Sequence, residues 1–149
     1  MMRSYTIPGR LMGRNESERL ARSHWSRANE VKRDETQTSE LYARAAGIGP
    51  WQGPVDIVVI FCEKVELTKK GKPKKPRDAD NIQGAEKAIV DGIVKAGIVP
   101  DDGPEHVRRV IPIVKYVGDD PHITVAISDY SPTLTITYPP VEIPGTEED

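Results

Sequence analysis

Residues 82–96, IQGAEKAIVDGIVKA, constrain the fold most, because their pattern is that of an amphipathic helix with one buried face. Successive residues of a helix turn by about 100°, which places the apolar residues within a sector of roughly 80°. This predicted core-facing stripe consists of Ile82, Ala85, Ile89, Ile93 and Ala96. The opposite side carries Asp80, Gly84, Lys87, Asp91 and Lys95. The segment is therefore expected to pack on a core and to present a charged face.

Residues 55–66, VDIVVIFCEKVE, are rich in β-branched side chains and predict the clearest strand of the chain. A short edge strand is predicted for SYTIPGR near the N-terminus, ended by Pro8 and Gly9. Further strands are predicted for residues 107–117, 122–127 and, more weakly, 133–138. Pro112 interrupts the 107–117 strand and favours an edge position there.

Two helices are predicted before the 55–66 strand. The first runs from Glu16 to about Arg33, where Asn15 and Glu18 resemble a capping box. The second runs from Ser39 to Ala46 and ends at Gly47. Together these elements predict a single α+β domain over residues 1–138, with a mixed or antiparallel β-sheet packed against helices. Residues 139–149, rich in proline and acid, are predicted to form a disordered tail.

The composition limits the cellular setting. A chain of 149 residues suits one core. No apolar run approaches the roughly 18 residues of a membrane span, and the N-terminus lacks the apolar segment of a secretory signal. Cys62 is the only cysteine, which excludes an intrachain disulfide, and its apolar neighbours favour burial over reactivity. We expect a cytoplasmic protein that does not contact a membrane.

The net charge of −2 conceals an asymmetry between the two halves of the chain. Residues 1–77 contain 16 Lys and Arg against 9 Asp and Glu, whereas residues 78–149 contain 5 against 14. The densest positive block is predicted to be a mobile loop, since proline, glycine and like charges oppose regular structure. Its candidate DNA-binding residues are Lys69, Lys70, Lys72, Lys74, Lys75 and Arg77. The alternative is a solvated run of charge with no ligand.

Pairs of acids flank the 82–96 segment, with Asp78 and Asp80 before it and Asp101 and Asp102 after it. The simpler interpretation is that the first pair caps the helix N-terminus and that charged residues four apart form solvated ion pairs. If the loop after the helix folds back, three carboxylates converge. Two such charges about 5 Å apart repel by about 3 kcal/mol at an effective dielectric near 20, so a cation is needed. Oxygen ligands alone favour Mg²⁺, with Mn²⁺ as an alternative.

These motifs carry a family resemblance. DADN at 78–81, KAIVDGIVKAG at 87–97 and PDD at 100–102 resemble the signature of the RusA family of Holliday junction resolvases. Members of that family are metal-dependent endonucleases common in phages and prophages. The resemblance is specific over about residues 75–107, and a weaker likeness joins IPGR and Asn15 to the family's N-terminal strand.

The resemblance implies a role for each matching residue. By position, Asp78, Asp80 and Asp102 match the family's catalytic, metal-binding carboxylates, and Asp101, beside the last of them, is a further candidate metal ligand. Lys87 matches the catalytic lysine, although three extra residues separate it from the DADN motif in comparison with the best-known members. Three residues make nearly one helical turn, which keeps Lys87 on the acidic face.

The same resemblance implies that Arg77 contacts DNA and that Asp91 matches a common family aspartate with a structural role. The implied activity is resolution of four-way DNA junctions by paired, symmetric, Mg²⁺-dependent phosphodiester hydrolysis. Two symmetric cuts require two active sites, so a homodimer is expected. Two other interpretations stay open: a structure-selective DNA-binding protein without cleavage, and a nuclease for other branched or flapped DNA.

Overall fold

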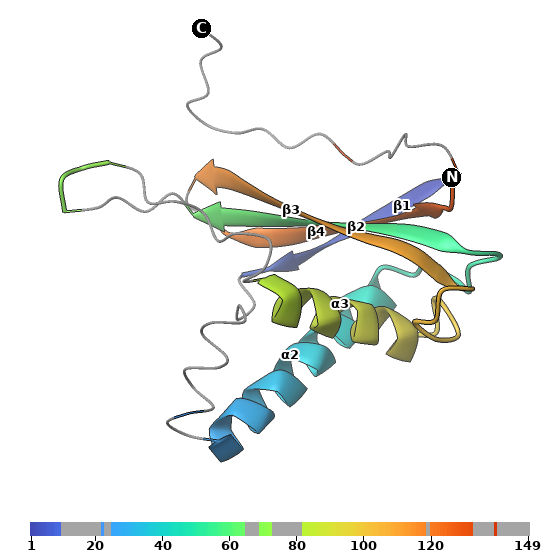
Figure 1. Cartoon of the computed structure of the whole chain (residues 1–149), viewed down its shortest axis with the longest axis horizontal. Helices are drawn as coiled ribbons and strands as arrows, with labels where there is room; N and C mark the ends of the chain where they lie inside the picture. Colours follow the sequence, from blue (N-terminus) through green and yellow to red (C-terminus); the bar gives the residue numbers. More distant parts are fainter. Residues whose placement is uncertain are drawn as a thin grey trace, which may run out of the picture.

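The computed structural model describes residues 1–9, 22, 25–64, 69–72, 82–118, 120–132 and 139. Within these residues the elements are β1 (Met2–Pro8), α2 (Trp25–Ala45), β2 (Val55–Lys64), α3 (Gln83–Lys95), β3 (Val107–Gly118) and β4 (His122–Asp129). The strands form one sheet in the order β1-β4-β2-β3. Figure 1 shows both helices on the same face of this sheet, which confirms the predicted α+β fold.

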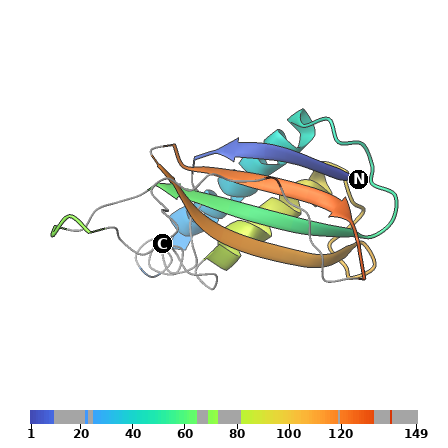
Figure 2. The same ribbon diagram turned by 90° about the horizontal axis from the view of Figure 1, so that it is seen from above.

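The sheet is mixed, as predicted. β4 pairs antiparallel with both β1 and β2, whereas β3 pairs parallel with β2. Parallel neighbours need a crossover connection, and α3 supplies it between β2 and β3. β1 and β3 lie at the two ends of the strand order (Figure 2), which confirms the edge positions predicted for the N-terminal strand and, from Pro112, for the 107–117 strand.

β2 forms the centre of the core. Every residue from Val55 to Cys62 is at most 2% exposed. Alternate side chains point to opposite faces of a strand, so β2 contributes to two apolar clusters. The main cluster lies on the face that packs with the helices, and it includes Ile57, Val59 and Phe61. The smaller one includes Val58, Ile60 and Cys62. Cys62 is buried as expected, and its burial raises the pKa of the thiol.

α3 confirms the predicted amphipathic helix. Ile82, Ala85, Ile89 and Ile93 are fully buried in the main cluster. Gly84, Lys87 and Lys95 are exposed on the opposite side, and Asp91 is partly exposed. The helix ends before Gly97, whose φ of 78° belongs to the left-handed region that favours glycine.

The prediction of two separate helices before β2 is wrong, because α2 runs without a break from Trp25 to Ala45. Hydroxyl groups in the middle of α2 are satisfied inside the helix. Thr36 Oγ1 donates to the Lys32 carbonyl at 3.1 Å, and Ser39 Oγ donates to the Glu35 carbonyl at 2.9 Å. Such i−4 bonds let Ser and Thr sit within a helix instead of capping one.

The predicted end of this helical region is confirmed, since Gly47 follows α2 with a φ of 66°. α2 and α3 pack closely at Gly92. A Cβ added at Gly92 would lie 2.7 Å from Ser39 Cβ and 2.8 Å from the Glu40 amide nitrogen. Glycine is therefore what permits this close approach between the two helices.

Several predicted segments lie outside the described residues. They are residues 10–21 with the capping box, residues 73–81 with most of the basic block and the DADN motif, the 133–138 strand, and the tail apart from Pro139. No helix in the described ranges combines the length and apolarity needed to cross a membrane.

Candidate active site

A groove of about 420 Å³ lies between α3 and the beginning of β3, and we call it the acidic groove. The charged side chains that line it are Glu86, Lys87, Asp91, Asp102, Arg108 and Arg109. Val90, Val107 and Val110 form its apolar lining. The loop after α3 therefore returns Asp102 to a surface shared with Lys87 and Asp91. This is the fold-back that a converging carboxylate site requires of this loop.

In the loop after α3, the adjacent residues Asp101 and Asp102 differ in their contacts. The Gly103 amide donates to Asp101 Oδ1 at 2.7 Å, and the Gly103 carbonyl accepts from the His106 and Val107 amides at 2.9 Å. His106 Nε2 lies 3.8 Å from Asp101 Oδ2. Asp101 thus orders the loop by bonding within it, whereas the exposed Asp102 lines the groove.

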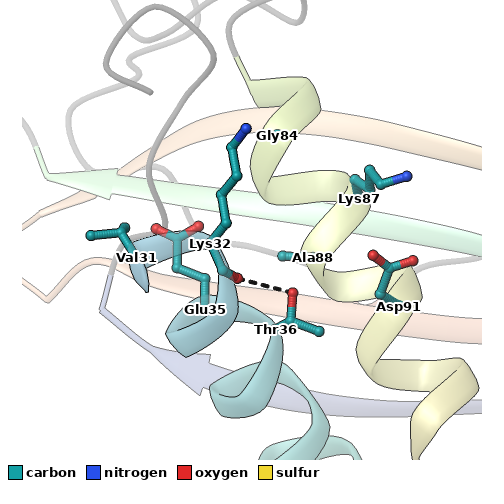
Figure 3. A pocket seen from close by; sticks show the side chains of 8 residues that line it. All are labelled: Val31, Lys32, Glu35, Thr36, Gly84, Lys87, Ala88 and Asp91. Atoms are coloured by element: carbon teal, nitrogen blue, oxygen red, sulfur yellow. Dashed lines mark hydrogen bonds between the residues drawn. The ribbon is translucent and has the colours of Figure 1, made fainter. Parts of the chain in front are cut away.

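Lys87 and Asp91 also line a second pocket, of about 210 Å³, between α2 and α3. Figure 3 shows the Lys87 ammonium directed away from α2, and the Asp91 carboxylate one turn further along α3. Lys32 extends from α2 on the other side of this pocket. Lys87 is therefore exposed on the acidic face of α3, where the sequence predicted it, between the two cavities.

Glu86 is a groove residue that the sequence reasoning missed. It is partly buried, and desolvation raises the pKa of its carboxyl group. A positional signal existed: at about 100° per residue, Glu86 falls only about 20° from Ile93 on the helical wheel. A carboxylate beside the core stripe has to lie at the boundary of the core, and here that boundary is the wall of the groove.

Arg109 has its charge matched inside the protein. Its Nε donates to Asp56 Oδ1 at 2.8 Å, and its Nη2 donates to Asp56 Oδ2 at 2.5 Å and to the Ser131 carbonyl at 2.7 Å. The Asp56 side chain is only 3% exposed, and the Arg109 side chain is 25% exposed, so this is a partly buried, two-point ion pair that raises the pKa of Arg109. Asp56 is a charged residue within a β-branched run, and a charge buried in a strand needs a partner of opposite charge. The sequence therefore indicated that such a partner exists.

The donor chemistry of the groove fits a hard divalent cation. Its candidate ligands are carboxylates, whereas Cys62 is enclosed in the sheet and His106 does not line the groove. Oxygen ligands suit Mg²⁺ or Mn²⁺. Among the described residues no three His, Cys, Asp or Glu side chains are grouped to hold a metal ion. Asp78 and Asp80, the predicted partners of Asp102, lie outside those residues.

The described part of the basic block is exposed. Lys69, Lys70 and Lys72 all lie at the surface in a turn after β2, where Gly71 has a φ of 77°. The other predicted DNA-binding residues, Lys74, Lys75 and Arg77, lie outside the described part of the chain. The assignment of this block to DNA binding stays a prediction.

Comparison with known proteins identifies the family. The family model described as endodeoxyribonuclease RusA matches residues 12–128, which is more than three quarters of the chain. The match includes β2, α3, β3 and the whole acidic groove. A search of curated proteins gives no match. The chain therefore belongs to the RusA endodeoxyribonuclease family, the Holliday junction resolvases.

Proposed function

We propose that this protein resolves four-way DNA junctions by Mg²⁺-dependent hydrolysis of two symmetric phosphodiester bonds. The observation that carries the proposal is the acidic groove, which unites Lys87, Asp91 and Asp102 in a chain of the RusA family. A cleft with acids and an exposed lysine offers both metal ligands and a cation for a phosphate.

Chain connectivity supports a site shared by the two acid pairs. Asp80 precedes Ile82 by two positions, so their Cα atoms are at most about 7 Å apart. Ile82 directly precedes α3, whose first turns place Glu86 and Lys87 on the groove. The DADN motif directly precedes Ile82 in the sequence, so we propose that its carboxylates join Asp102 at this groove. We propose Asp78, Asp80 and Asp102 as the metal ligands, with Asp101 in a supporting position.

The metal, Lys87 and the lysines after β2 each have a part in this proposal. A bound Mg²⁺ would polarise the scissile phosphate and lower the pKa of a bound water. Lys87, exposed beside the carboxylates, contacts a nonbridging phosphate oxygen and offsets the charge that develops on it. Lys69, Lys70 and Lys72 hold the flanking backbone without reading its sequence. Paired cuts require two such sites, so we propose that a twofold homodimer is the active form.

The first prediction concerns the metal. Wild-type protein should nick a synthetic four-way junction at symmetric positions in Mg²⁺ and leave it intact in EDTA, because the groove's carboxylates lack activity without their ion. The products should be resolved on a denaturing gel, with linear duplex of the same sequence as the control. Tight junction binding with no cuts in Mg²⁺ or Mn²⁺ would leave only a structure-selective binding protein.

A second prediction concerns the basic block. Replacing Lys69 and Lys70 together with alanine should lower the slope of log K against log salt by about 1.8, since each duplex phosphate contact contributes about 0.9. Junction affinity at a series of salt concentrations, measured by fluorescence anisotropy in EDTA, tests this. Lys95→Ala, an exposed lysine at the far end of α3, is the matched control and should leave the slope unchanged. An unaltered salt slope in the double variant would mean that Lys69 and Lys70 do not contact DNA phosphates and that the block is a solvated run of charge.

A further inference from the structure

β3 begins with a β-bulge whose extra residue is Arg108. Val55 of β2 pairs with Val107, and the next residue, Asp56, pairs with Arg109. Arg108 therefore has no partner on β2. Bulges redirect a side chain and occur often beside active sites, and they are rare between parallel strands. This bulge lies at the wall of the acidic groove.

The bulge changes which residues face the core. Val107 is buried in the main cluster, and Val110 packs against the same cluster. In a regular strand, residues three apart point to opposite faces, so one extra residue is what allows both valines to point inward. The two intervening arginines are thereby removed from the core and placed at the groove.

The two arginines have different surroundings. Arg109 is bound by Asp56 and the Ser131 carbonyl, so its donors are used within the protein. Arg108 is exposed, and its guanidinium carbon lies 4.8 Å from the centre of the Tyr130 ring. A cation–π contact consumes none of the N–H donors that a guanidinium uses on oxygen acceptors. Arg108 thus combines a held position with N–H donors that form no hydrogen bond to any residue in the described ranges, and these donors can meet an incoming ligand.

Tyr130 is itself fixed. Its amide donates to the Pro54 carbonyl at 2.9 Å, and the Arg109 guanidinium carbon lies 5.2 Å from its ring centre. The Asp56–Arg109 pair therefore supports the ring on which Arg108 rests. Because the Arg108 side chain is already held in place, it loses less conformational entropy when a ligand binds.

We infer that Arg108 is a DNA phosphate-binding residue, held on Tyr130 at the β3 wall of the acidic groove, opposite Lys87 on α3. The ligand is a phosphodiester of the strand in the groove, because guanidinium donors match phosphate oxygens in two-point geometry. The inference rests on the proposed function for the identity of the groove as the site of cleavage. It adds a second cation to a groove whose other unpaired cation among the described residues is Lys87.

The test compares Arg108→Ala and Arg108→Lys with Arg3→Ala. Arg3 is exposed on β1, at the other end of the strand order, and serves as the matched control. Junction binding in EDTA should weaken about tenfold in Arg108→Ala, with the salt slope reduced by about 0.9, and Arg108→Lys should lie between it and the wild type. In Mg²⁺ the cleavage KM should rise more than kcat falls. Arg3→Ala should match the wild type throughout.

A purely structural role for Arg108 would lower the unfolding temperature of Arg108→Ala. If Arg108 binds phosphate instead, Arg108→Ala should unfold at the wild-type temperature, because an exposed side chain that packs on one ring contributes little to stability. A junction with a single neutral methylphosphonate provides the second readout. Placed at one position of the junction, the methylphosphonate should weaken binding by the wild type. At that position it should not change binding by Arg108→Ala, because this variant has already lost the phosphate contact.

Unchanged affinity and slope in Arg108→Ala, or a loss explained entirely by a lower unfolding temperature, would overturn the inference. Failure of the proposed function is distinguishable from this. If the wild type does not cut junctions, yet Arg108→Ala still loses one phosphate's share of the salt slope on plain duplex, the phosphate contact stands and the resolvase proposal falls.

Discussion

Asp102→Asn should lower junction cleavage by on the order of 1,000-fold while junction binding stays intact, because the amide keeps the shape of the side chain but removes a negative metal ligand. Binding should stay equal or become tighter, since one charge that repels phosphate is removed from the groove. Single-turnover cleavage in Mg²⁺ and anisotropy in EDTA measure the two effects separately.

The adjacent aspartate offers a matched control. Asp101→Asn makes the same chemical change one residue away, and its amide oxygen can still accept the hydrogen bond from the Gly103 amide. Because Asp101 bonds within the loop and does not line the groove, its replacement should reduce cleavage far less than Asp102→Asn does. Equal losses would make Asp101 a metal ligand as well, and full activity in Asp102→Asn would place the active site elsewhere.

Gly92→Val should destabilise the protein by about 3 kcal/mol, because side-chain atoms added here meet backbone rather than a flexible side chain. Even the Cβ would lie 2.8 Å from the backbone carbonyl carbon of Ser39. For a chain of this length, this corresponds to a fall in the unfolding midpoint of about 6–12 °C. Thermal unfolding followed by circular dichroism measures it.

The same helix contains a glycine suited to be the control. Gly84 is exposed in the first turn of α3, so Gly84→Ala should leave the midpoint unchanged or raise it slightly, through better helix propensity. Gly92→Ala should fall between these cases, since helix propensity offsets part of the steric cost. A wild-type midpoint in Gly92→Val would mean that α2 and α3 do not approach each other at this point in solution.

Local pattern was sufficient to predict β2 and α3, and tertiary contacts explain what it missed. The stripe that contains Ile82 and Ile89 repeats with the helical period, and its burial follows from that period alone. The break predicted near Asp34 was wrong because Thr36 and Ser39 bond back into α2. The bulge at Arg108 depends on which strand pairs with β3, and no local pattern within β3 specifies that partner.

In the candidate site, too, some residues could be predicted from local pattern and others depend on tertiary contacts. Helical spacing placed Lys87 and Asp91 on one face, whereas Asp102 was expected near them only if the loop after the helix folds back. The acidic groove contains all three. Glu86 belongs to none of the quoted motifs, although its place beside Ile93 on the helical wheel could have been recognised from the sequence. Arg109 and Asp56 are 53 positions apart, and only the pairing of β2 with β3 brings them into contact.

The strand order also determines when the fold can be completed during synthesis. β1 precedes the other described strands in the chain, yet it pairs with β4, in a register that joins Met2 to Ser128. A ribosome must therefore deliver nearly the whole domain before β1 gains its neighbour, whereas the β2–α3–β3 unit is available earlier. Pairings so distant along the chain slow folding, because loop closure costs entropy before the contacts form. Until β4 emerges, the buried residues of β2 lack the neighbouring strand on one side, and the nascent chain is most exposed to aggregation.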